Sequence, residues 1–213
     1  IPPQRTWGSS VRRVLIAPSL LACDFGHLAE EVARVQEAGA DWLHVDVMDG
    51  PFVPNLTIGP DVVAASRRAS RLPLDVHLMM DHPEAFVARF IDAGAAYVTV
   101  HVEAPGLSRP DELRQTLGAI RAKGAKAGLS LRPRTGIQTI QPYAEVLDLV
   151  LVMSVEPGFG GQTFLPEAIP KVRGLRGWFT RHLAVDGGIT AHTAGQMRDA
   201  GAVGVAIRKS LGK

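Results

Sequence analysis

The sequence predicts an α/β protein: a closed barrel of eight parallel strands and surrounding helices, a (β/α)8 barrel. Three observations lead to this prediction. About eight short β-rich runs recur along the chain, helix-like segments lie between them, and no long linker separates two halves. A chain of 213 residues that is 46% hydrophobic is long enough for one large domain. We assign residues 1–213 to a single barrel domain, with residues 1–12 as a loosely ordered N-terminal extension.

The strands are predicted from short runs rich in valine, isoleucine and leucine. They cover residues 13–22, 41–49, 74–80, 96–104, 126–133, 147–158, 183–189 and 203–207. Between the first two, Leu28, Val32 and Val35 have the spacing of an amphipathic helix over 26–39. Helices with a similar pattern are predicted over 82–94, 109–124 and 190–201.

Glycine ends each of these four predicted helices, at Gly39, Gly94, Gly124 and Gly201. Glycine readily adopts the left-handed conformation that stops a helix. A short turn into the next strand then favours parallel βα units over hairpins. An open doubly wound sheet is the alternative, but the Gly-rich turn that often follows its first strand is absent here.

Composition narrows the classes of partner and compartment. The chain has 23 basic and 21 acidic residues, a formal net charge of +2, so we expect neither nucleic acid nor a membrane surface as a partner. No apolar run approaches the roughly 18 residues of a membrane span. The single cysteine, Cys23, allows no internal disulfide, and residues 1–10 lack the apolar core of a signal peptide. We expect a cytoplasmic protein.

Polar residues gather at the C-terminal ends of the predicted strands, where barrels of this kind have their active sites. Because side chains alternate along a strand, His44, Asp46 and Met48 share one face. The next strand repeats the pattern. Its shared face holds Asp75, His77 and Met79, and other strand ends contribute Ser19, His101, Met153 and Asp186.

Four of these residues, His44, Asp46, His77 and Asp186, indicate a divalent metal or proton-transfer site. Any one buried histidine is most simply a hydrogen-bonded core residue. Four ionisable groups together at strand ends would be costly to bury without a cation, and imidazole and carboxylate are ordinary ligands of zinc, iron or manganese. Met48, Met79 and Met153 either fill the core or form an apolar cap over a bound substrate.

Two Gly-rich segments indicate a phosphate site. The first contains Gly158, Phe159, Gly160 and Gly161, and the second contains Gly187 and Gly188 just before a predicted helix. Backbone N–H groups without side-chain obstruction can approach an anion closely, and a helix N-terminus favours negative charge. Simple chain reversal is the alternative for either segment alone.

These motifs, in this order, resemble the ribulose-phosphate 3-epimerase family over nearly the whole chain. The similar stretches are "IAPSLLACDF", "LHVDVMDGPFVPNLTIGP", "DVHLMM", "VMSVEPGFGGQTFLPEAIPKVRGLR" and "VDGGIT". The resemblance implies a barrel of the ribulose-phosphate-binding type that interconverts D-ribulose 5-phosphate and D-xylulose 5-phosphate, in the pentose phosphate pathway or carbon fixation. It also implies a homo-oligomer, a dimer or a hexamer.

The resemblance also implies roles for individual residues. His44, Asp46, His77 and Asp186 would hold one divalent ion (zinc, iron, manganese or cobalt), and the two aspartates would be the acid–base pair. Ser19 and His77 would contact the substrate. The segment Gly158–Gly161, with Gly187 and Gly188, would lie along the substrate towards its phosphate.

The chain departs from the family pattern in two places. After the fifth strand the family usually has Asn-Pro-x-Thr, and here Arg132 stands in place of the asparagine. After the eighth strand, "DAGAVGVAIRKSLGK" lacks the Gly-Ser pair that helps bind phosphate, and the stretch before the seventh strand is short. Either the protein is truncated in these regions or the sequence given omits disordered residues, and we favour the second.

Three other functions are alternatives. An epimerase for a six-carbon ketose phosphate would have nearly the same motifs. An enzyme similar to orotidine-phosphate decarboxylase would need an Asp-x-Lys-x-x-Asp motif, which is absent where Asp46 begins "DVMD". A metabolite-binding barrel without catalysis would be expected to lose one of the four polar residues, and all four are present.

Overall fold

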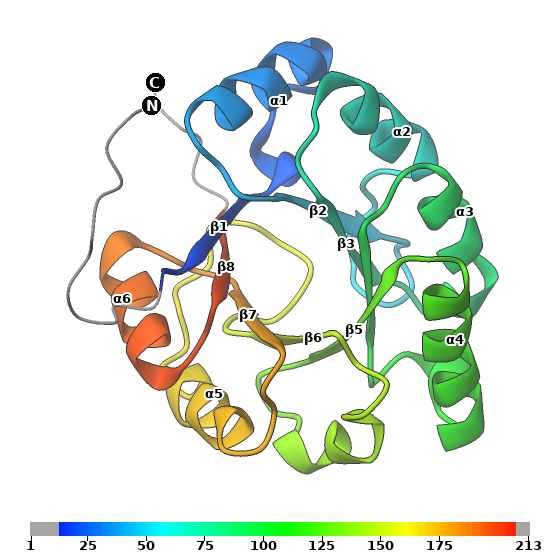
Figure 1. Cartoon of the computed structure of the whole chain (residues 1–213), viewed down its shortest axis with the longest axis vertical. Helices are drawn as coiled ribbons and strands as arrows, with labels where there is room; N and C mark the ends of the chain where they lie inside the picture. Colours follow the sequence, from blue (N-terminus) through cyan, green and yellow to red (C-terminus); the bar gives the residue numbers. More distant parts are fainter. Residues whose placement is uncertain (1–12, 208–213) are drawn as a thin grey trace, which may run out of the picture.

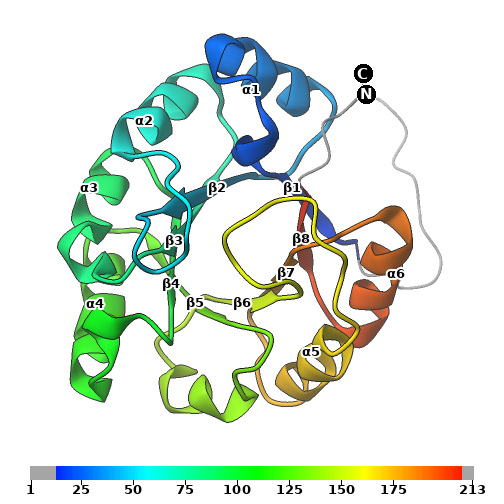
Figure 2. The ribbon, with the colours of Figure 1, turned by 180° about the vertical axis from the view of Figure 1, so that it is seen from behind.

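The structure of the chain, a computed structural model, describes residues 13–207. Eight parallel strands form one sheet in the order β1-β8-β7-β6-β5-β4-β3-β2, and Figures 1 and 2 show it curled into a barrel with the helices outside. The predicted (β/α)8 barrel is therefore confirmed. The strands are β1 (Leu15–Pro18), β2 (Leu43–Met48), β3 (Leu74–Met79), β4 (Tyr97–His101), β5 (Lys126–Leu131), β6 (Leu149–Met153), β7 (His182–Asp186) and β8 (Gly204–Ile207).

The barrel closes between β1 and β2 through few backbone contacts. The carbonyl of Ile16 accepts hydrogen bonds from the backbone N–H groups of Asp41 and Trp42, at 2.9 and 3.3 Å. Further along, Ser19 and His44 form an isolated parallel bridge. Strand β1 ends at Pro18, and the Ser19 side chain accepts from the backbone N–H of Leu21. The seam therefore brings Ser19 beside His44.

Six α-helices lie among the described residues, and all surround the sheet (Figure 1). They are α1 (Leu28–Glu37), α2 (Pro60–Ala69), α3 (Val87–Asp92), α4 (Pro110–Ala122), α5 (Ala168–Arg176) and α6 (Ala191–Ala200). The predicted stop glycines adopt positive φ, with values of 89° at Gly39, 111° at Gly94, 90° at Gly124 and 111° at Gly201. The predicted helix ends are therefore correct.

Two connections differ from a regular βα pattern. The predicted helix over 82–94 is a 3-10 turn followed by the six-residue α3, because Phe86 between them has φ −120° and ψ −19°. Between β5 and β6 there are only two 3-10 turns, Ile137–Thr139 and Gln141–Tyr143. Pro142 lacks the backbone N–H that a longer helix would need there.

The core has two parts on the two sides of the sheet. Val45 and Val47 belong to the large apolar cluster that includes buried helix residues such as Val32 and Val63, as their alternation with His44 and Asp46 predicts. Inside the barrel, the N-terminal ends of the strands are filled by aromatic rings. The ring of Trp42 lies 4.5 Å from that of Tyr97 and 5.3 Å from that of His182, between centroids.

Some predictions fall outside the described residues. The loosely ordered extension over residues 1–12 is one, so the assignment of 1–213 to one domain stays a prediction. The prediction about the chain beyond Ile207, which lacks the family's Gly-Ser pair, is another that lies outside the described residues. None of the helices within 13–207 has the length and apolar character needed to span a membrane.

Two glycines give opposite expectations for stability. At Gly128 in β5, an added Cβ would lie 2.2 Å from Thr99 Oγ1 on the neighbouring strand, so Gly128→Ala should cost about 1–3 kcal/mol. At Gly118 in α4, an added Cβ would meet no atom within 4 Å outside the backbone of its own helix and its chain neighbours. Gly118→Ala should therefore stabilise the protein by about 0.5–1 kcal/mol. Thermal unfolding should shift by about 2–4 °C per kcal/mol in these opposite directions. Equal shifts would contradict the packing at Gly128.

Candidate active site

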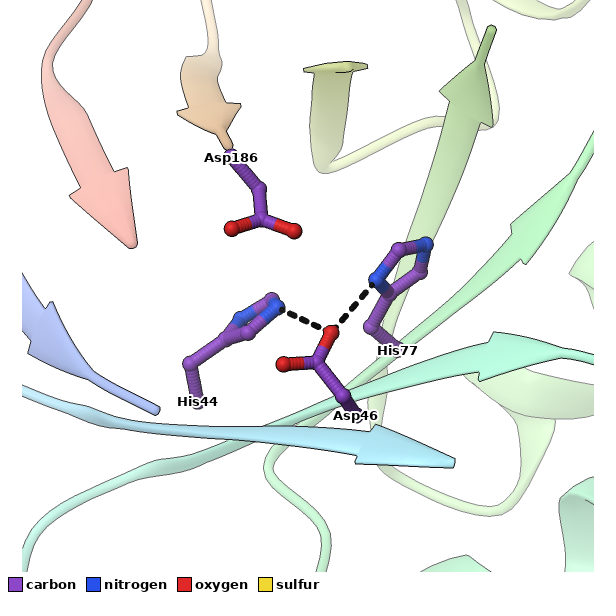
Figure 3. A group of neighbouring side chains, drawn as sticks. All are labelled: His44, Asp46, His77 and Asp186. Carbon is purple, nitrogen blue, oxygen red and sulfur yellow. Dashed lines mark hydrogen bonds and ion pairs between the residues drawn. The ribbon is translucent and has the colours of Figure 1, made fainter. Parts of the chain in front are cut away.

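Asp46, near the C-terminal end of β2, lies at the centre of a group of polar side chains inside the barrel. Its Oδ2 accepts a hydrogen bond from Ser19 Oγ at 2.7 Å. Its Oδ1 lies 3.2 Å from His44 Nε2 and 3.1 Å from His77 Nδ1. Figure 3 shows the two imidazole rings on either side of this carboxylate, and Asp186 points toward the group from β7. Asp46, His44, His77 and Asp186 are all fully buried.

His44 is held from its other side by a second carboxylate. Its Nδ1 lies 2.8 Å from Asp75 Oδ2, which comes from β3 and is 2% exposed. Burial alone would lower the pKa of His44, but the charges of Asp46 and Asp75 outweigh burial and raise this pKa well above its usual value of 6.5. The ring orientation that directs Nε2 to Asp46 is therefore fixed by Asp75.

His77 belongs to a chain of side chains that leads away from Asp46. Its Nε2 lies 2.8 Å from Nε2 of His101 on β4, and His101 Nδ1 lies 3.0 Å from Glu103 Oε2. Burial lowers the pKa of His101 to about 4, although Glu103 opposes this. Burial would raise the pKa of Glu103, but the hydrogen bond from His101 outweighs it and the pKa falls to about 2.

Asp186 reaches the group from the opposite side of the closure seam. In sheet order, β1 and β8 separate its strand from β2. The end of β7 is held by Ser154, whose backbone N–H donates to the Asp186 carbonyl at 2.8 Å and whose Oγ donates to the Gly187 carbonyl at 2.6 Å. The carboxylates of Asp46 and Asp186 nevertheless converge, because their ligand atoms lie within 4.8 Å of each other.

The four side chains fit a divalent metal ion. Each offers one ligand atom, and these atoms all lie within 4.8 Å of one another. The buried Nε2 of His44 faces the carboxylate of Asp46 at 3.2 Å, so a cation that replaces the proton of this nitrogen would meet both groups together. Two imidazoles and two carboxylates are a common ligand set for zinc, iron, manganese or cobalt. The group predicted from the sequence is therefore brought together.

The three methionines fall into two apolar clusters. Met48 and Met79 pack with Val53, and Phe52 lies against this cluster. Met153 packs instead with barrel-interior residues such as Leu151. All three methionines are at most 1% exposed. Met48 and Met79 are therefore adjacent, whereas Met153 approaches from β6, where it is paired with Asp186 in the sheet register.

A cavity of about 260 Å³ opens between the loops that follow β6 and β7, next to the end of β7 that carries Asp186. Its lining includes Phe159, Gly160, Gly161, Gly187 and Gly188, together with Thr190, which precedes the first residue of α6. Phe159 is 52% exposed. Five of the six residues predicted to lie along the substrate therefore line one cavity, and only Gly158 does not.

The glycines of these loops also have structural reasons. Gly187 has φ 113°, and a Cβ on it would lie 2.4 Å from Val155 Cγ2. Gly188 has φ 63°, and a Cβ there would lie 2.5 Å from the backbone nitrogen of Phe164. Gly158 (φ 128°) and Gly161 (φ 78°) also need the left-handed region. Chain geometry alone thus accounts for these four glycines, and the evidence for an anion site lies in the cavity.

Sequence reasoning missed two residues that support the site and the roles of two others. Ser154 and Glu103 fall inside the predicted strands, but in the structure β6 ends at Met153 and β4 ends at His101, so both side chains belong to loops. Asp75 and His101 were placed on inward faces but given no part in the site. For Asp75, its position in β3, paired with His44 in the register of β2, was the available signal.

Fold and site together define a TIM-barrel protein with a candidate metal centre at the C-terminal ends of its strands. Its fold resembles the tryptophan synthase A-subunit from Pyrococcus furiosus, with a TM-score of 0.71 and 14% identity, over 93% of this chain and 88% of that one. It also resembles the N-acetylmannosamine-6-phosphate 2-epimerase from Clostridium perfringens, with a TM-score of 0.68 and 11% identity, over 99% and 93%. At such identities these likenesses show the fold alone.

Sequence comparison goes further. The sequence model described as "Ribulose-phosphate 3 epimerase family" matches residues 15–210. The "Ribulose-phosphate 3-epimerase" of Synechocystis is 47% identical over 90% of this chain and 84% of its own length. The protein of the same name from Bacillus subtilis is 43% identical over 89% and 88%. The chain belongs to the ribulose-phosphate 3-epimerase family, whose members are isomerases acting on carbohydrates.

The pKa of His101 predicts a loss of stability in mild acid. The unfolded chain protonates this histidine near 6.5 and the folded protein only near 4, so below pH 6.5 the unfolded state binds more protons. Stability of the metal-free protein should fall as pH drops from 6.5 to 5, with up to about 1.4 kcal/mol per pH unit due to His101. The raised pKa of His44 acts above this window, because its contribution is fully present below 6.5 and is lost only as pH rises.

The measurement is the urea midpoint of chelator-treated protein between pH 7.5 and 5, a window above the titration of Glu103. His101→Gln should show a shallower pH dependence than the wild type, whatever its absolute stability. His82→Gln, whose side chain is 67% exposed, should behave as the wild type. Parallel curves for the wild type and His101→Gln would refute the expectation.

Proposed function

We propose that this chain interconverts D-ribulose 5-phosphate and D-xylulose 5-phosphate by moving a proton at C3. The observation that carries the proposal is the convergence of Asp46 and Asp186, from strands on two sides of the closure seam, within the ligand group of four. The proposal is also supported by the 43–49% sequence identity of this chain to curated proteins named ribulose-phosphate 3-epimerase.

Epimerisation beside a ketone removes a proton from one face of the carbon and returns a proton to the other face. That chemistry requires two acid–base groups on opposite sides of a planar enediolate. In the direction of xylulose phosphate, Asp46 takes the proton from C3 and Asp186 supplies one on the other face, and the roles exchange in reverse. Ser19, which donates to Asp46 Oδ2 at 2.7 Å, orients the first carboxylate.

His44, Asp46, His77 and Asp186 would hold one divalent ion, zinc, iron, manganese or cobalt. Such an ion supplies Lewis-acid stabilisation of the negative charge that develops on the substrate oxygens. The protein residues keep the ligand atoms oriented, because Asp75 holds the far nitrogen of His44 in place.

The remaining site residues are proposed to bind and enclose the sugar phosphate. Ser19 and His77 contact the substrate near the reacting carbon. The segment 158–161, with Gly187 and Gly188, lies toward the phosphate, and the N-terminus of α6 adds a favourable dipole for the anion. Met48, Met79 and Met153 form the apolar cap that keeps water from the enediolate.

Replacing either aspartate tests the acid–base assignment. Asp46→Asn and Asp186→Asn keep the side-chain shape but cannot exchange the proton, so each should lower kcat by about 10²- to 10⁴-fold. The measurement is a coupled assay for xylulose 5-phosphate, with a six-carbon ketose phosphate as the rival substrate. Asp61→Asn on the first turn of α2 is the control and should keep full activity. Substantial turnover by either variant would contradict the two-aspartate mechanism.

Metal removal tests the other half of the proposal. Dialysis against a chelator should abolish turnover, and adding back zinc, iron, manganese or cobalt one at a time should restore it and rank the metals. A chelator-treated enzyme shown to be metal-free by elemental analysis, yet fully active, would rule out the metal role.

Other expectations about the molecule in the cell stay predictions. They are a small-molecule sugar phosphate as the partner, no nucleic acid or membrane partner, a homo-oligomer, and a cytoplasmic location.

A further inference from the structure

We propose that Glu103 is a positioning residue for the metal centre. Acting through His101, it fixes the tautomer of His77 so that the Nδ1 lone pair of His77 faces the metal position. The inference rests on the metal centre of the proposed function, and it assigns a role to two residues outside the ligand group.

The direction of each hydrogen bond follows from the chemistry of the groups. The Glu103 carboxylate can only accept, so His101 Nδ1, at 3.0 Å from it, carries the proton. A neutral imidazole has one N–H, which makes His101 Nε2 an acceptor. His77 Nε2, at 2.8 Å from that atom, must therefore donate. Without a cation, His77 Nδ1 donates to Asp46 Oδ1 at 3.1 Å, and a cation that replaces this proton would meet the Nδ1 lone pair while Nε2 keeps its own proton.

The surroundings of His101 keep it neutral and immobile. The ring is fully buried and lies between two others, with centroids 4.9 Å from the ring of His77 and 4.9 Å from that of Phe52. A positive charge there would be poorly solvated, and an apolar ring covers one side. A neutral His101 between Glu103 and His77 therefore links the two by hydrogen bonds that fix which nitrogen of His77 carries the proton, and it adds no charge to the site.

Glu103 is itself held by the segment in which this chain departs from the family pattern. Its Oε1 accepts from the backbone N–H of Arg132 at 2.8 Å. The Arg132 guanidinium lies 4.3 Å from the centroid of the Phe52 ring and donates to the Phe52 carbonyl at 3.0 Å. Arg132 therefore fixes both Glu103 and the ring that covers His101.

The two metal-ligand histidines thus reach carboxylates by different routes. His44 contacts Asp75 directly at 2.8 Å, inside the barrel. His77 reaches Glu103 through His101, and the Glu103 side chain is 22% exposed. Outer partners of ligating histidines commonly change metal affinity by 10- to 100-fold. Because Glu103 lies one residue further from the metal position than such partners, we expect its replacement to change metal affinity about tenfold, the lower end of that range.

The tautomers can be observed directly in the wild-type protein. Two-bond ¹H–¹⁵N correlation spectra distinguish a protonated from an unprotonated ring nitrogen. His101 should be protonated at Nδ1 and His77 at Nε2, both in the chelator-treated protein and with zinc added. A proton on Nε2 of His101 in the wild type would overturn the proposal, without any variant having to fold.

Glu103→Gln tests the cause of this arrangement with an almost isosteric side chain. Its amide oxygen can accept from Arg132 N–H or from His101 Nδ1–H, but its NH₂ group then faces the other donor. The conflict should move His101 toward the Nε2–H tautomer, which opposes the Nε2–H of His77. Zinc affinity, measured by competition with a chromophoric chelator, should fall about tenfold. Glu112→Gln, at the surface of α4, is the matched control and should match the wild type.

The outcomes separate this inference from the proposed function. Wild-type protein that binds no zinc would overturn the metal centre and, with it, this positioning role. Wild-type protein that binds zinc, together with a folded Glu103→Gln variant of unchanged affinity and unchanged His101 tautomer, would overturn the positioning role alone. A weaker zinc site with a changed tautomer in Glu103→Gln, and neither change in Glu112→Gln, is the expected result.

Discussion

The buried carboxylate of Asp46 is the constraint on which the rest of the site depends. A carboxylate with no solvent exposure is stable only with several polar partners, and Ser19, His44 and His77 supply them at 2.7–3.2 Å. His44 and His77 come from β2 and β3, and Ser19 directly follows β1. Ser19 and His44 also form the isolated bridge at the closure seam. The contacts that close the barrel at this seam therefore also place Ser19 and His44 around the Asp46 carboxylate.

The barrel interior divides along its axis. At the N-terminal ends of the strands, the stacked rings of Trp42 and Tyr97 fill the space with apolar surface. Toward the C-terminal ends, the inward positions hold histidines and aspartates. The aromatic end supplies burial that stabilises the fold, and the strands extend from it to hold the polar end in a fixed geometry.

The fold and the ligand group could be predicted from the sequence because both depend on strand periodicity. Alternation in "HVDVM" places His44 and Asp46 on one face, and the same alternation places His77 beside them. The roles of Ser154 and Glu103 could not be predicted, because the predicted strands run past the observed ends of β6 and β4, and beyond those ends loop conformation decides what a side chain contacts. The loop glycines show the reverse error: Gly188 suggests an anion site, yet a close backbone contact with Phe164 already requires it.

The two sides of the site differ in their surroundings, and the difference suits the chemistry. From β2 to β4, an unbroken chain of short contacts runs from Ser19 through Asp46, His77 and His101 to Glu103. On the other side, Asp186 stands at the end of β7, and the glycine-lined cavity of about 260 Å³ opens next to that strand. A sugar phosphate entering there would meet a carboxylate and ligand set already oriented on one side. The loops after β6 and β7 would provide the space to admit the phosphate on the other.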